Sequence, residues 1–498
     1  MHAITLERYR LDQLGALALQ RTPLALDTAV VAAIDRGARF VAEQVASGKM
    51  IYGVTTGFGA LAERVVPVDQ VSELQRRHVV SHACGVGDWT PEPIARLALL
   101  IKLLTFRGGH TGITVATVER LLALWNRGVI PAIPMQGTVG ASGDLAPLAH
   151  LALPLLGLGH VHVDGDVIAT GDAIRDLPLQ LGPKEGLALT NGIQFIGALG
   201  VHAVLACERL IKAADAIASL STQAFSGAKD FYAARYHETS LHVDRQLVAA
   251  NLRVLLAGSN HHALPTAVGS RQDPYSFRCI PQVHGAIRQT VRFAHATLED
   301  EVNGVSDNPL FFPDDELVLC GGALHGESVA MQLDFLAIAI SELASISERR
   351  TYQLLSGRRG LPDFLIANPG LNSGLMVAQY TAAALVNHNK VLATPASIDS
   401  IPTCQLQEDH VSMGGTSGLK LLQIIDHTST VLAIELLAAA QATELAPGLV
   451  PSERTAAIVR AFRREVATLD EDRVLATDVA AARLFLDRQL PRLLEDLA

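Results

Sequence analysis

A short stretch of this chain places one serine among three glycines, just before residues that favour a helix. It reads Gly137-Thr138-Val139-Gly140-Ala141-Ser142-Gly143-Asp144. A glycine nitrogen can approach the carbonyl two residues earlier because no Cβ obstructs it. If the Gly143 nitrogen attacked the Ala141 carbonyl, a five-membered ring would close. Loss of water there and from Ser142 would leave an exocyclic methylene, an electrophile that no ordinary side chain supplies.

Other interpretations of the same stretch lead to different chemistry. A nucleophile elbow needs Gly-x-Ser-x-Gly, but position 144 is Asp. A phosphate-binding loop ends in Gly-Lys-Ser/Thr, and this stretch has no lysine. A plain glycine-rich turn remains as open as cyclisation on the triplet alone. In each case Asp144 is expected to cap the following helix and Pro147 to lie in its first turn, so that the positive helix end points toward Ser142.

The longer segment from Gly140 to His150, Gly-Ala-Ser-Gly-Asp-Leu-Ala-Pro-Leu-Ala-His, resembles the signature of the histidine and aromatic amino-acid ammonia-lyases. In that family the triplet cyclises to 4-methylidene-imidazol-5-one (MIO), which here implies MIO formed from Ala141, Ser142 and Gly143. The resemblance covers nearly the whole chain. It also implies a homotetramer with a central helical bundle, in which each active site is built from three subunits.

Three further segments in the first half of the chain resemble family motifs. Tyr52 lies in Ile51-Tyr52-Gly53-Val54-Thr55-Thr56-Gly57-Phe58-Gly59 and matches the tyrosine that acts as catalytic base, whose pKa a nearby positive charge or helix end would have to lower. His82 matches a residue that contacts the substrate ring, although a histidine at a helix end is otherwise more often a C-cap partner. Asn191 matches an asparagine that hydrogen-bonds near the prosthetic group, and an Asn-Gly turn is the alternative.

The second half of the chain carries the remaining candidates. The segment Gln272-Asp273-Pro274-Tyr275-Ser276-Phe277-Arg278 is similar to a family motif in which the arginine clamps the substrate carboxylate. Tyr275 would then lie against the prosthetic ring with Gln272 nearby; without the resemblance, Arg278 reads as a surface ion pair. Glu408 matches an acidic residue of the histidine-type enzymes, suited to pair with an imidazole N–H, and a helix-capping glutamate is the alternative. Met376 also favours the histidine type.

Several pocket positions depart from the histidine-type pattern. The usual Gly-Gly-Asn-Phe-His appears with Ala323 and Leu324, Leu406 replaces an asparagine, Thr190 adds a hydroxyl to an aliphatic position, and Asn387-His388-Asn389 replaces Ser-Glu-Asn. Losing amides and adding aliphatic bulk reshapes a site, because unpaired buried polar groups are costly. The chemistry is therefore better supported than the substrate.

Three functions remain open. The first is elimination of ammonia from L-histidine to give trans-urocanate. The second is a lyase or 2,3-aminomutase acting on tyrosine or another aromatic amino acid. The third is a non-catalytic relative that only binds a ligand.

Composition limits the class of protein. The 498 residues are 49% hydrophobic and 18% charged, and the formal net charge is −10, which argues against nucleic acid as a main partner. Five scattered cysteines lack metal or disulfide spacing. Acidic residues interrupt the most apolar runs, and the N-terminus has no apolar core. We therefore expect a cytoplasmic protein without a metal ion and without membrane attachment; the resemblance implies that it is an enzyme acting on a small amino acid.

Hydrophobic periodicity predicts a mainly α fold with two domains. Residues 1–192 form an N-terminal domain of mixed structure that carries the MIO loop, with a hairpin turning at Asp164-Gly165. Residues 193–498 form a bundle with a helical C-terminal tail. The long helices are expected at 193–223, 282–303, 327–355, 374–393 and 415–444, with apolar positions around most of their circumference.

Overall fold

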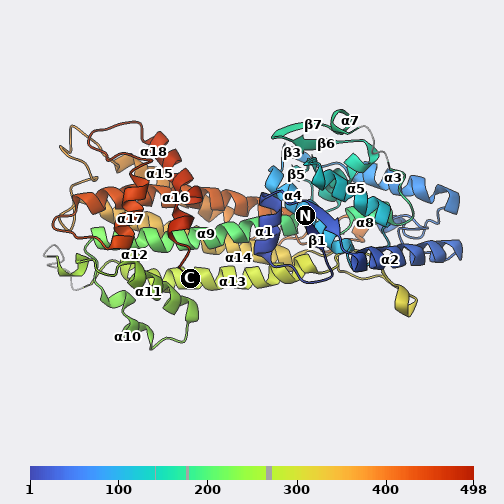
Figure 1. Cartoon of the computed structure of the whole chain (residues 1–498), viewed down its shortest axis with the longest axis horizontal. Helices are drawn as coiled ribbons and strands as arrows, with labels where there is room; N and C mark the ends of the chain where they lie inside the picture. The colour runs from blue at the N-terminus through green and yellow to red at the C-terminus, as the bar shows by residue number, and fades with distance from the viewer. Residues whose placement is uncertain (141, 175–178, 265–271, 498) are drawn as a thin grey trace. The chain divides into compact units, whose positions relative to one another are not determined.

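The computed structural model describes residues 1–140, 142–174, 179–264 and 272–497. The described residues are dominated by α-helices joined by short strands (Figure 1), which confirms the mainly α fold expected from the periodicity. The five predicted long helices are present with ends shifted by at most two residues. They are α9 (Gln194–Ala224), α13 (Ile280–Asn303), α14 (Glu327–Leu354), α15 (Met376–Leu392) and α16 (Gly414–Leu445).

Contacts divide the chain into two compact units. The first unit comprises Met1–Leu205, Ala294–Asp334 and Pro395–Leu419, and the second comprises Ala206–Phe293, Phe335–Thr394 and Lys420–Ala498. Each unit is assembled from segments distant in the sequence. The boundary predicted between residues 192 and 193 stays a prediction.

Short strands in the first unit form four small sheets. Their bounds are β1 (His2–Ile4), β2 (Leu24–Leu26), β3 (Val86–Trp89), β4 (Ile130–Pro131), β5 (Pro134–Gln136), β6 (His160–Val163), β7 (Asp166–Ala169), β8 (Leu310–Phe312) and β9 (Leu317–Leu319). The first pair, β1 and β2, is parallel, whereas the other pairs are antiparallel. Val163 pairs with Asp166 across Asp164-Gly165, which confirms the predicted hairpin.

Helices pack around these sheets to form the body of the first unit. They are α1 (Leu11–Leu19), α2 (Thr28–Ala46), α3 (Val71–His82), α4 (Glu92–Phe106), α5 (Val115–Asn126), α6 (Leu145–Ala152), α7 (Thr170–Ala173) and α8 (Glu185–Thr190). In α4 every residue from Ile94 to Phe106 is buried, including Lys102. A polar side chain on a fully buried helix needs hydrogen-bond partners within the protein. Lys102 has two, the Asn191 carbonyl oxygen and Gln194 Oε1.

Helices are the regular secondary structure of the second unit among its described residues. Besides parts of the long helices it contains α10 (Ala234–His237), α11 (Val243–Leu255), α12 (Tyr275–Arg278), α15, α17 (Glu453–Phe462), α18 (Leu475–Arg488) and α19 (Leu490–Leu493). Its interior holds a hydrogen-bonded charge network. Asp215 accepts from His284 and Arg288, each at 2.8 Å, and Arg350 binds Glu435 through two contacts of 2.5 and 2.8 Å. Two carboxylates are thus matched by two guanidinium groups.

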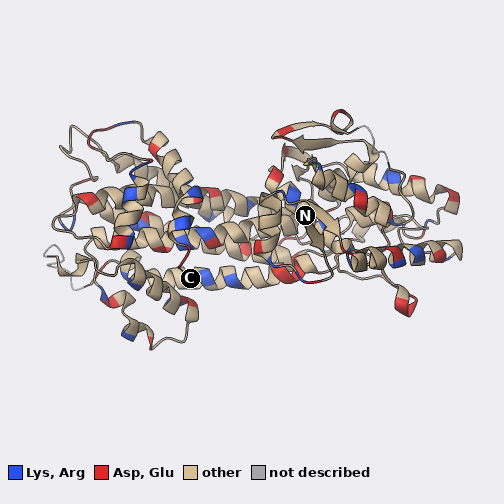
Figure 2. Cartoon of the chain, viewed as in Figure 1, with Lys and Arg blue, Asp and Glu red and all other residues tan. Residues whose placement is uncertain are grey.

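Three helices, α9, α14 and α16, are long and apolar enough to cross a membrane by length and composition, although the sequence had predicted no uninterrupted apolar span. Between 67% and 78% of their most apolar windows are buried inside the chain. Buried Asp215 and Glu435 lie on two of these helices. Lys and Arg are interspersed with Asp and Glu along the helices (Figure 2).

Candidate active site

The serine loop is held in a conformation that only glycine permits at one position. Gly143 has φ +73°, and a Cβ there would lie 2.1 Å from the Gly192 carbonyl oxygen. The same carbonyl accepts the Asp144 N–H at 2.7 Å. Ser142 also has a left-handed backbone, with φ +49°. Ala141 lies outside the described residues. The two residues that follow it are therefore tightly folded against the Asn191-Gly192 turn.

Asp144 occupies the N-cap position of α6 but its side chain caps another helix. The predicted side-chain cap of α6 is absent. Instead Oδ2 accepts the backbone N–H groups of Phe195 and Ile196 at 3.0 and 2.9 Å, in the first turn of α9, and Oδ1 accepts from Thr138 at 3.0 Å. Four N–H groups at a helix start need such acceptors. Burial raises the pKa of Asp144 to about 7. Asp144 does cap a helix with its side chain, as predicted, but the helix is α9 and not α6.

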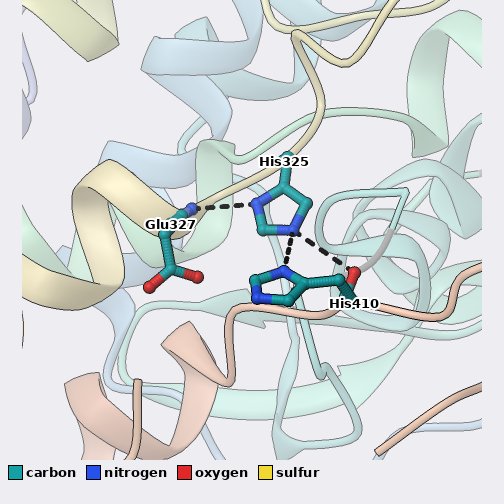
Figure 3. A group of neighbouring side chains, drawn as sticks. All are labelled: His325, Glu327 and His410. Atoms are coloured by element: carbon teal, nitrogen blue, oxygen red, sulfur yellow. Dashed lines mark hydrogen bonds between the residues drawn. The ribbon is translucent and has the colours of Figure 1, made fainter. Parts of the chain in front are cut away.

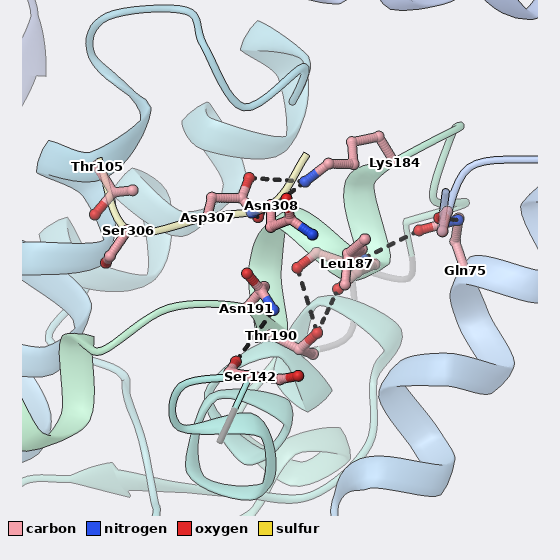
Figure 4. Close-up of polar contacts among 12 residues, drawn as sticks. Gln75, Thr105, Ser142, Lys184, Leu187, Thr190, Asn191, Ser306, Asp307 and Asn308 are labelled. Atoms are coloured by element: carbon pink, nitrogen blue, oxygen red, sulfur yellow. Dashed lines mark hydrogen bonds and ion pairs between the residues drawn. The ribbon is translucent and has the colours of Figure 1, made fainter. Parts of the chain in front are cut away.

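Asn191 connects the serine loop to the buried helix α4. Its Nδ2 donates to the Ser142 carbonyl oxygen at 3.1 Å, and its own carbonyl oxygen accepts from Lys102 Nζ at 2.6 Å (Figure 4 draws the asparagine contact). Burial lowers the pKa of Lys102 to about 7. Asn191 Oδ1 is buried without a hydrogen-bond partner. Asn191 therefore forms the Asn-Gly turn and also contacts the serine loop. Its Oδ1 remains available as an acceptor in the site.

An ion pair in the same unit is fully buried. Lys184 Nζ lies 2.7 and 2.9 Å from the two carboxylate oxygens of Asp307, and both side chains are fully inaccessible to solvent (Figure 4). Asp307 Oδ1 also accepts the Asn308 N–H at 2.7 Å. A buried pair of this kind is tolerated only when its geometry and extra hydrogen bonds are good. It joins the segment before α8 to the segment before β8.

Glu408 contacts the serine directly. Ser142 Oγ donates to Glu408 Oε1 at 2.6 Å, and Thr403 Oγ1 donates to Oε2 at 2.6 Å. The carboxylate therefore binds two hydroxyl groups, and the contact to Ser142 is one that helix capping would not require. Cys404, Gln405 and Leu406, immediately before it, all have positive φ, between 50° and 70°. A bridge between Thr403 and Glu408 closes this left-handed turn.

Tyr52 lies beside the same serine, in a loop that starts at Ile51. Its hydroxyl oxygen accepts the Gly59 N–H at 2.9 Å. Burial raises the pKa of Tyr52 above its ordinary value, the Gly59 N–H lowers it, and Cys404, Glu408 and Cys320 add smaller increases. The proposed role as a base predicts a positive charge or helix end that lowers this pKa. The described surroundings within the chain have the opposite net effect.

His82 ends helix α3 and has a defined tautomer. Its Nδ1 lies 2.7 Å from the His78 carbonyl oxygen. Because a carbonyl only accepts, Nδ1 carries the proton and Nε2 is an acceptor. Burial lowers the pKa of His82, which keeps the ring neutral. The C-cap role considered from the sequence is therefore real, and it leaves the second nitrogen free to meet a donor.

Two cavities, of about 690 and 590 Å³, meet at the serine. Four residues line both: Tyr52, Gly59, Ser142 and Glu408. The first cavity is also lined by Leu324 and His325, and the second by His82, Asn191 and Leu187. The structure thus brings seven predicted site residues to one place in the first unit: Tyr52, His82, Ser142, Gly143, Asn191, Leu324 and Glu408.

Four predicted site residues, Gln272, Tyr275, Arg278 and Met376, belong to the second unit. Tyr275 is 70% exposed, and the Arg278 guanidinium carbon lies 4.4 Å from the centre of its ring. Arg278 Nε is buried without a hydrogen-bond partner. The ring contact, rather than the ion pair considered from the sequence, is the described interaction of Arg278.

A group of potential metal ligands lies at the rim of the first cavity. His325, Glu327 and His410 each offer a ligand atom, and these atoms lie within 4.8 Å of one another (Figure 3). The Glu327 N–H donates to His325 Nδ1 at 3.3 Å, so His325 Nε2 carries the proton. It points to His410 Nδ1 at 3.1 Å. Both ring nitrogens of His325 are thus engaged in hydrogen bonds, one of them to the ring of His410.

The positions that depart from the histidine-type pattern differ in their surroundings. Leu324 lines the first cavity, whereas Leu406 is 71% exposed within the left-handed turn. His388 belongs to the second unit and its ring lies 5.0 Å from that of His427. Thr190 is fully buried and its hydroxyl lies 2.8 Å from His78 Nε2.

Sequence reasoning missed several residues of the site. His78 contacts both Thr190 and His82, while Cys404 Sγ accepts the Ala60 N–H at 3.3 Å. Cys320 lines the first cavity. The hydroxyl of Thr190 in the apolar run Leu187-Ala188-Leu189 was the available signal for a buried polar partner; nothing in the sequence marked the cysteines.

The chain is similar in sequence and in fold to known enzymes. A family model described as aromatic amino acid lyase matches residues 9–464. A histidine ammonia-lyase of Symbiobacterium thermophilum is 44% identical over 475 residues, which cover 95% of this chain and 94% of that protein. The crystal structure of histidine ammonia-lyase from Trypanosoma cruzi superposes with a TM-score of 0.92 at 37% identity, covering 100% and 96% of the two chains.

A tyrosine aminomutase from Streptomyces globisporus has the same fold, with a TM-score of 0.93 at 32% identity and coverage of 100% and 99%. Fold and matched length together define a carbon–nitrogen lyase. The chain belongs to the aromatic amino acid lyase family. The resemblance found in the sequence motifs is confirmed.

Proposed function

We propose that this enzyme eliminates ammonia from L-histidine to give trans-urocanate. The observation that carries the proposal is the convergence of Ser142, Tyr52, His82 and Glu408 on adjoining cavities of one unit. Histidine ammonia-lyases at 44% identity over nearly the full length support the choice of substrate. Absence of urocanate formation from histidine by the purified protein would refute it.

The serine loop suits the MIO group. Gly143 has the conformation and the confined space that a substituted residue could not adopt, and Asn191 Nδ2 holds the Ser142 carbonyl oxygen. Ala141, Ser142 and Gly143 would form the ring, which supplies an electrophilic methylene for the substrate amino group. The buried contacts of Asp144 and Asn191 keep the backbone around the triplet in one arrangement.

Residues of the first unit would bind the imidazole and move a proton. Glu408 offers a carboxylate and His82 an acceptor Nε2, and each can receive a ring N–H. A fixed ring orientation converts encounter into a positioned complex. Tyr52 would take the β-proton as a general base. Since burial raises its pKa, this role requires a nearby positive charge that lowers the pKa in the working enzyme.

The four candidates of the second unit give a reason to propose a homotetramer with shared sites. Tyr275 is a large exposed aromatic beside Arg278, the residue expected to bind the substrate carboxylate. If another subunit supplied these residues together with Gln272 and Met376, the site would gain the carboxylate clamp and a positive charge for Tyr52. The cytoplasm is the expected compartment. Mass photometry or light scattering measures the assembly.

A tyrosine-type lyase or aminomutase is the second candidate, favoured by Leu324 in the cavity wall where the histidine type carries an aromatic residue. The structural match to a tyrosine aminomutase supports keeping it. A phenolic O–H can also donate to His82 Nε2.

One experiment tests both the chemistry and the substrate. Intact mass of the purified protein should show the loss of two waters, and the Ser142→Ala variant should keep both waters and lose nearly all turnover. Incubation with histidine, tyrosine and phenylalanine then shows which unsaturated acid or β-amino acid forms. A Ser142→Ala variant with normal activity would exclude MIO chemistry.

A further inference from the structure

Two buried polar residues, Thr190 and His78, form a contact next to His82. Thr190 Oγ1 donates to the Gly186 carbonyl oxygen at 3.0 Å, one turn earlier in α8 (Figure 4 shows Thr190). The same oxygen lies 2.8 Å from His78 Nε2. We assign the threonine proton to the helix carbonyl and His78 Nε2 as the donor, because the opposite assignment would bury an unpaired N–H at His78 Nδ1. Thr190 therefore fixes His78 as the tautomer protonated at Nε2.

The ring of His78 remains uncharged in this environment. It is buried, and burial lowers its pKa well below the ordinary value, with smaller contributions from His82 and Lys184. Its Nδ1 is buried without a hydrogen-bond partner. The contact with Thr190 is thus the hydrogen bond described for this ring. Without it, both ring nitrogens would be buried and unpaired, and only contacts with neighbouring rings would orient His78.

His78 holds His82 in two ways. Its carbonyl oxygen accepts His82 Nδ1–H at 2.7 Å, which sets the tautomer. Its ring centroid lies 4.0 Å from that of His82, with 43° between the planes, and 3.9 Å from that of Phe58. His78 therefore contacts both Phe58, in the loop that carries Tyr52, and His82, which lines the cavity. A rotation of His78 would displace both neighbours.

We propose that Thr190 and His78 are positioning residues that hold His82 Nε2 as an acceptor in the cavity and thereby favour substrates whose ring carries an N–H or O–H donor. The inference rests on the proposed role of His82 toward the substrate ring. It extends that role to two buried residues, of which His78 also lines the second cavity and Thr190 does not. If Thr190 only filled space in the core, replacing it would weaken the binding of ligands with and without a ring donor to the same extent.

The test compares two unsaturated acids, trans-urocanate and trans-cinnamate, as competitive inhibitors. Trans-urocanate carries a ring N–H, whereas trans-cinnamate has no ring donor. In Thr190→Val the inhibition constant of urocanate should rise about five- to tenfold, while that of cinnamate changes less than twofold. Thr190→Ser keeps the hydroxyl and should match the parent enzyme. His78→Phe keeps the ring stack without the N–H and should behave like Thr190→Val.

A matched control exists in the second unit. Thr443 is also a buried helical threonine whose hydroxyl donates to the carbonyl one turn earlier, at 2.8 Å from Ala439. Thr443→Val should leave both inhibition constants unchanged. Intact mass verifies that each variant loses two waters. Equal changes for both inhibitors in Thr190→Val, or no change in either, would refute the positioning role.

Failure of the proposed function is visible separately. A parent enzyme that makes coumarate from tyrosine and no urocanate from histidine would refute the histidine assignment. The comparison would then use coumarate, whose phenol is a donor, against cinnamate. Loss of discrimination in Thr190→Val would still support the pair, and equal effects on both would still refute it.

Discussion

Ser142 Oγ and Glu408 Oε1 lie 2.6 Å apart although 266 positions separate them in the chain. The contact brings a carboxylate to the serine of the proposed ring-forming triplet. It also links the serine loop to the left-handed turn that starts at Cys404. Variants of these residues therefore report on the chemistry as well as on the fold.

Glu408→Gln should shift the pH dependence of turnover. The negative charge of Glu408 contributes to raising the pKa of Tyr52. Removing it lowers that pKa, so the fraction of ionised Tyr52 rises at lower pH and the ascending limb of kcat/KM moves to lower pH. The plateau should fall about 10- to 100-fold, as expected for losing a hydrogen bond to a charged group. Steady-state kinetics across pH measures both effects.

Glu63→Gln is the control for this experiment, because Glu63 lines the first cavity but is not among the groups that shift the pKa of Tyr52. It should leave the pH profile in place. A Glu408→Gln profile whose ascending limb stays at the same pH would contradict the assignment of Tyr52 as the base.

Gly143→Ala should block maturation of the serine loop. The new Cβ would lie 2.1 Å from the Gly192 carbonyl oxygen at a backbone φ of +73°. Backbone on both sides must then move, so the intact mass should retain both waters and activity should be lost. Gly165→Ala also sits at positive φ, but nothing lies within 4 Å of its Cβ. That variant should mature normally, and loss of maturation there would point to a general folding defect.

Leu406→Asn should stabilise the turn before Glu408. Leu406 has φ +70°, a left-handed conformation that costs a non-glycine residue roughly 1–2 kcal/mol and that asparagine tolerates better. Because the side chain is 71% exposed, little packing is lost. We expect the Tm to rise by about 1–2 °C in calorimetry. Leu371→Asn, at a more exposed leucine outside the positive-φ set, should not raise it.

Lys184→Met should destabilise the protein strongly. Removing one partner leaves Asp307 buried and unpaired, which costs about 3–5 kcal/mol for ion pairs of this kind. The double variant Lys184→Met/Asp307→Leu removes both charges and should recover most of the lost Tm. Thermal unfolding measured by circular dichroism compares the three proteins. A double variant as unstable as the single one would show that the pair contributes something other than charge balance.

The sequence predicted the long helices well because their apolar pattern is sustained over many turns, as in α9 and α16. It missed β1 and β2, since strands of three residues carry too little pattern and their pairing depends on the intervening helix α1. The residues between the predicted helices, including α11 (Val243–Leu255), were also left unassigned.

In the site, motif resemblance found Ser142, Tyr52 and Glu408, whereas contacts across the chain stayed hidden. The cap formed by Asp144 serves a helix 50 residues later, and His78 meets Thr190 over 112 positions. Local rules describe only neighbours in sequence, so a side chain that turns toward a distant element escapes them. The raised pKa of Tyr52 escaped for the same reason, because burial is a property of the folded chain.

Asp144 binds the first backbone amides of α9 through its carboxylate, and Gly192 binds the Asp144 N–H. A chain emerging from the ribosome therefore lacks the anchor for its serine loop until residues 192–196 have been made and have begun to coil. The proposed ring closure must wait for that moment. The loss of two waters, measured by mass on fragments of increasing length released from the ribosome, would then show at which chain length this part of the protein folds.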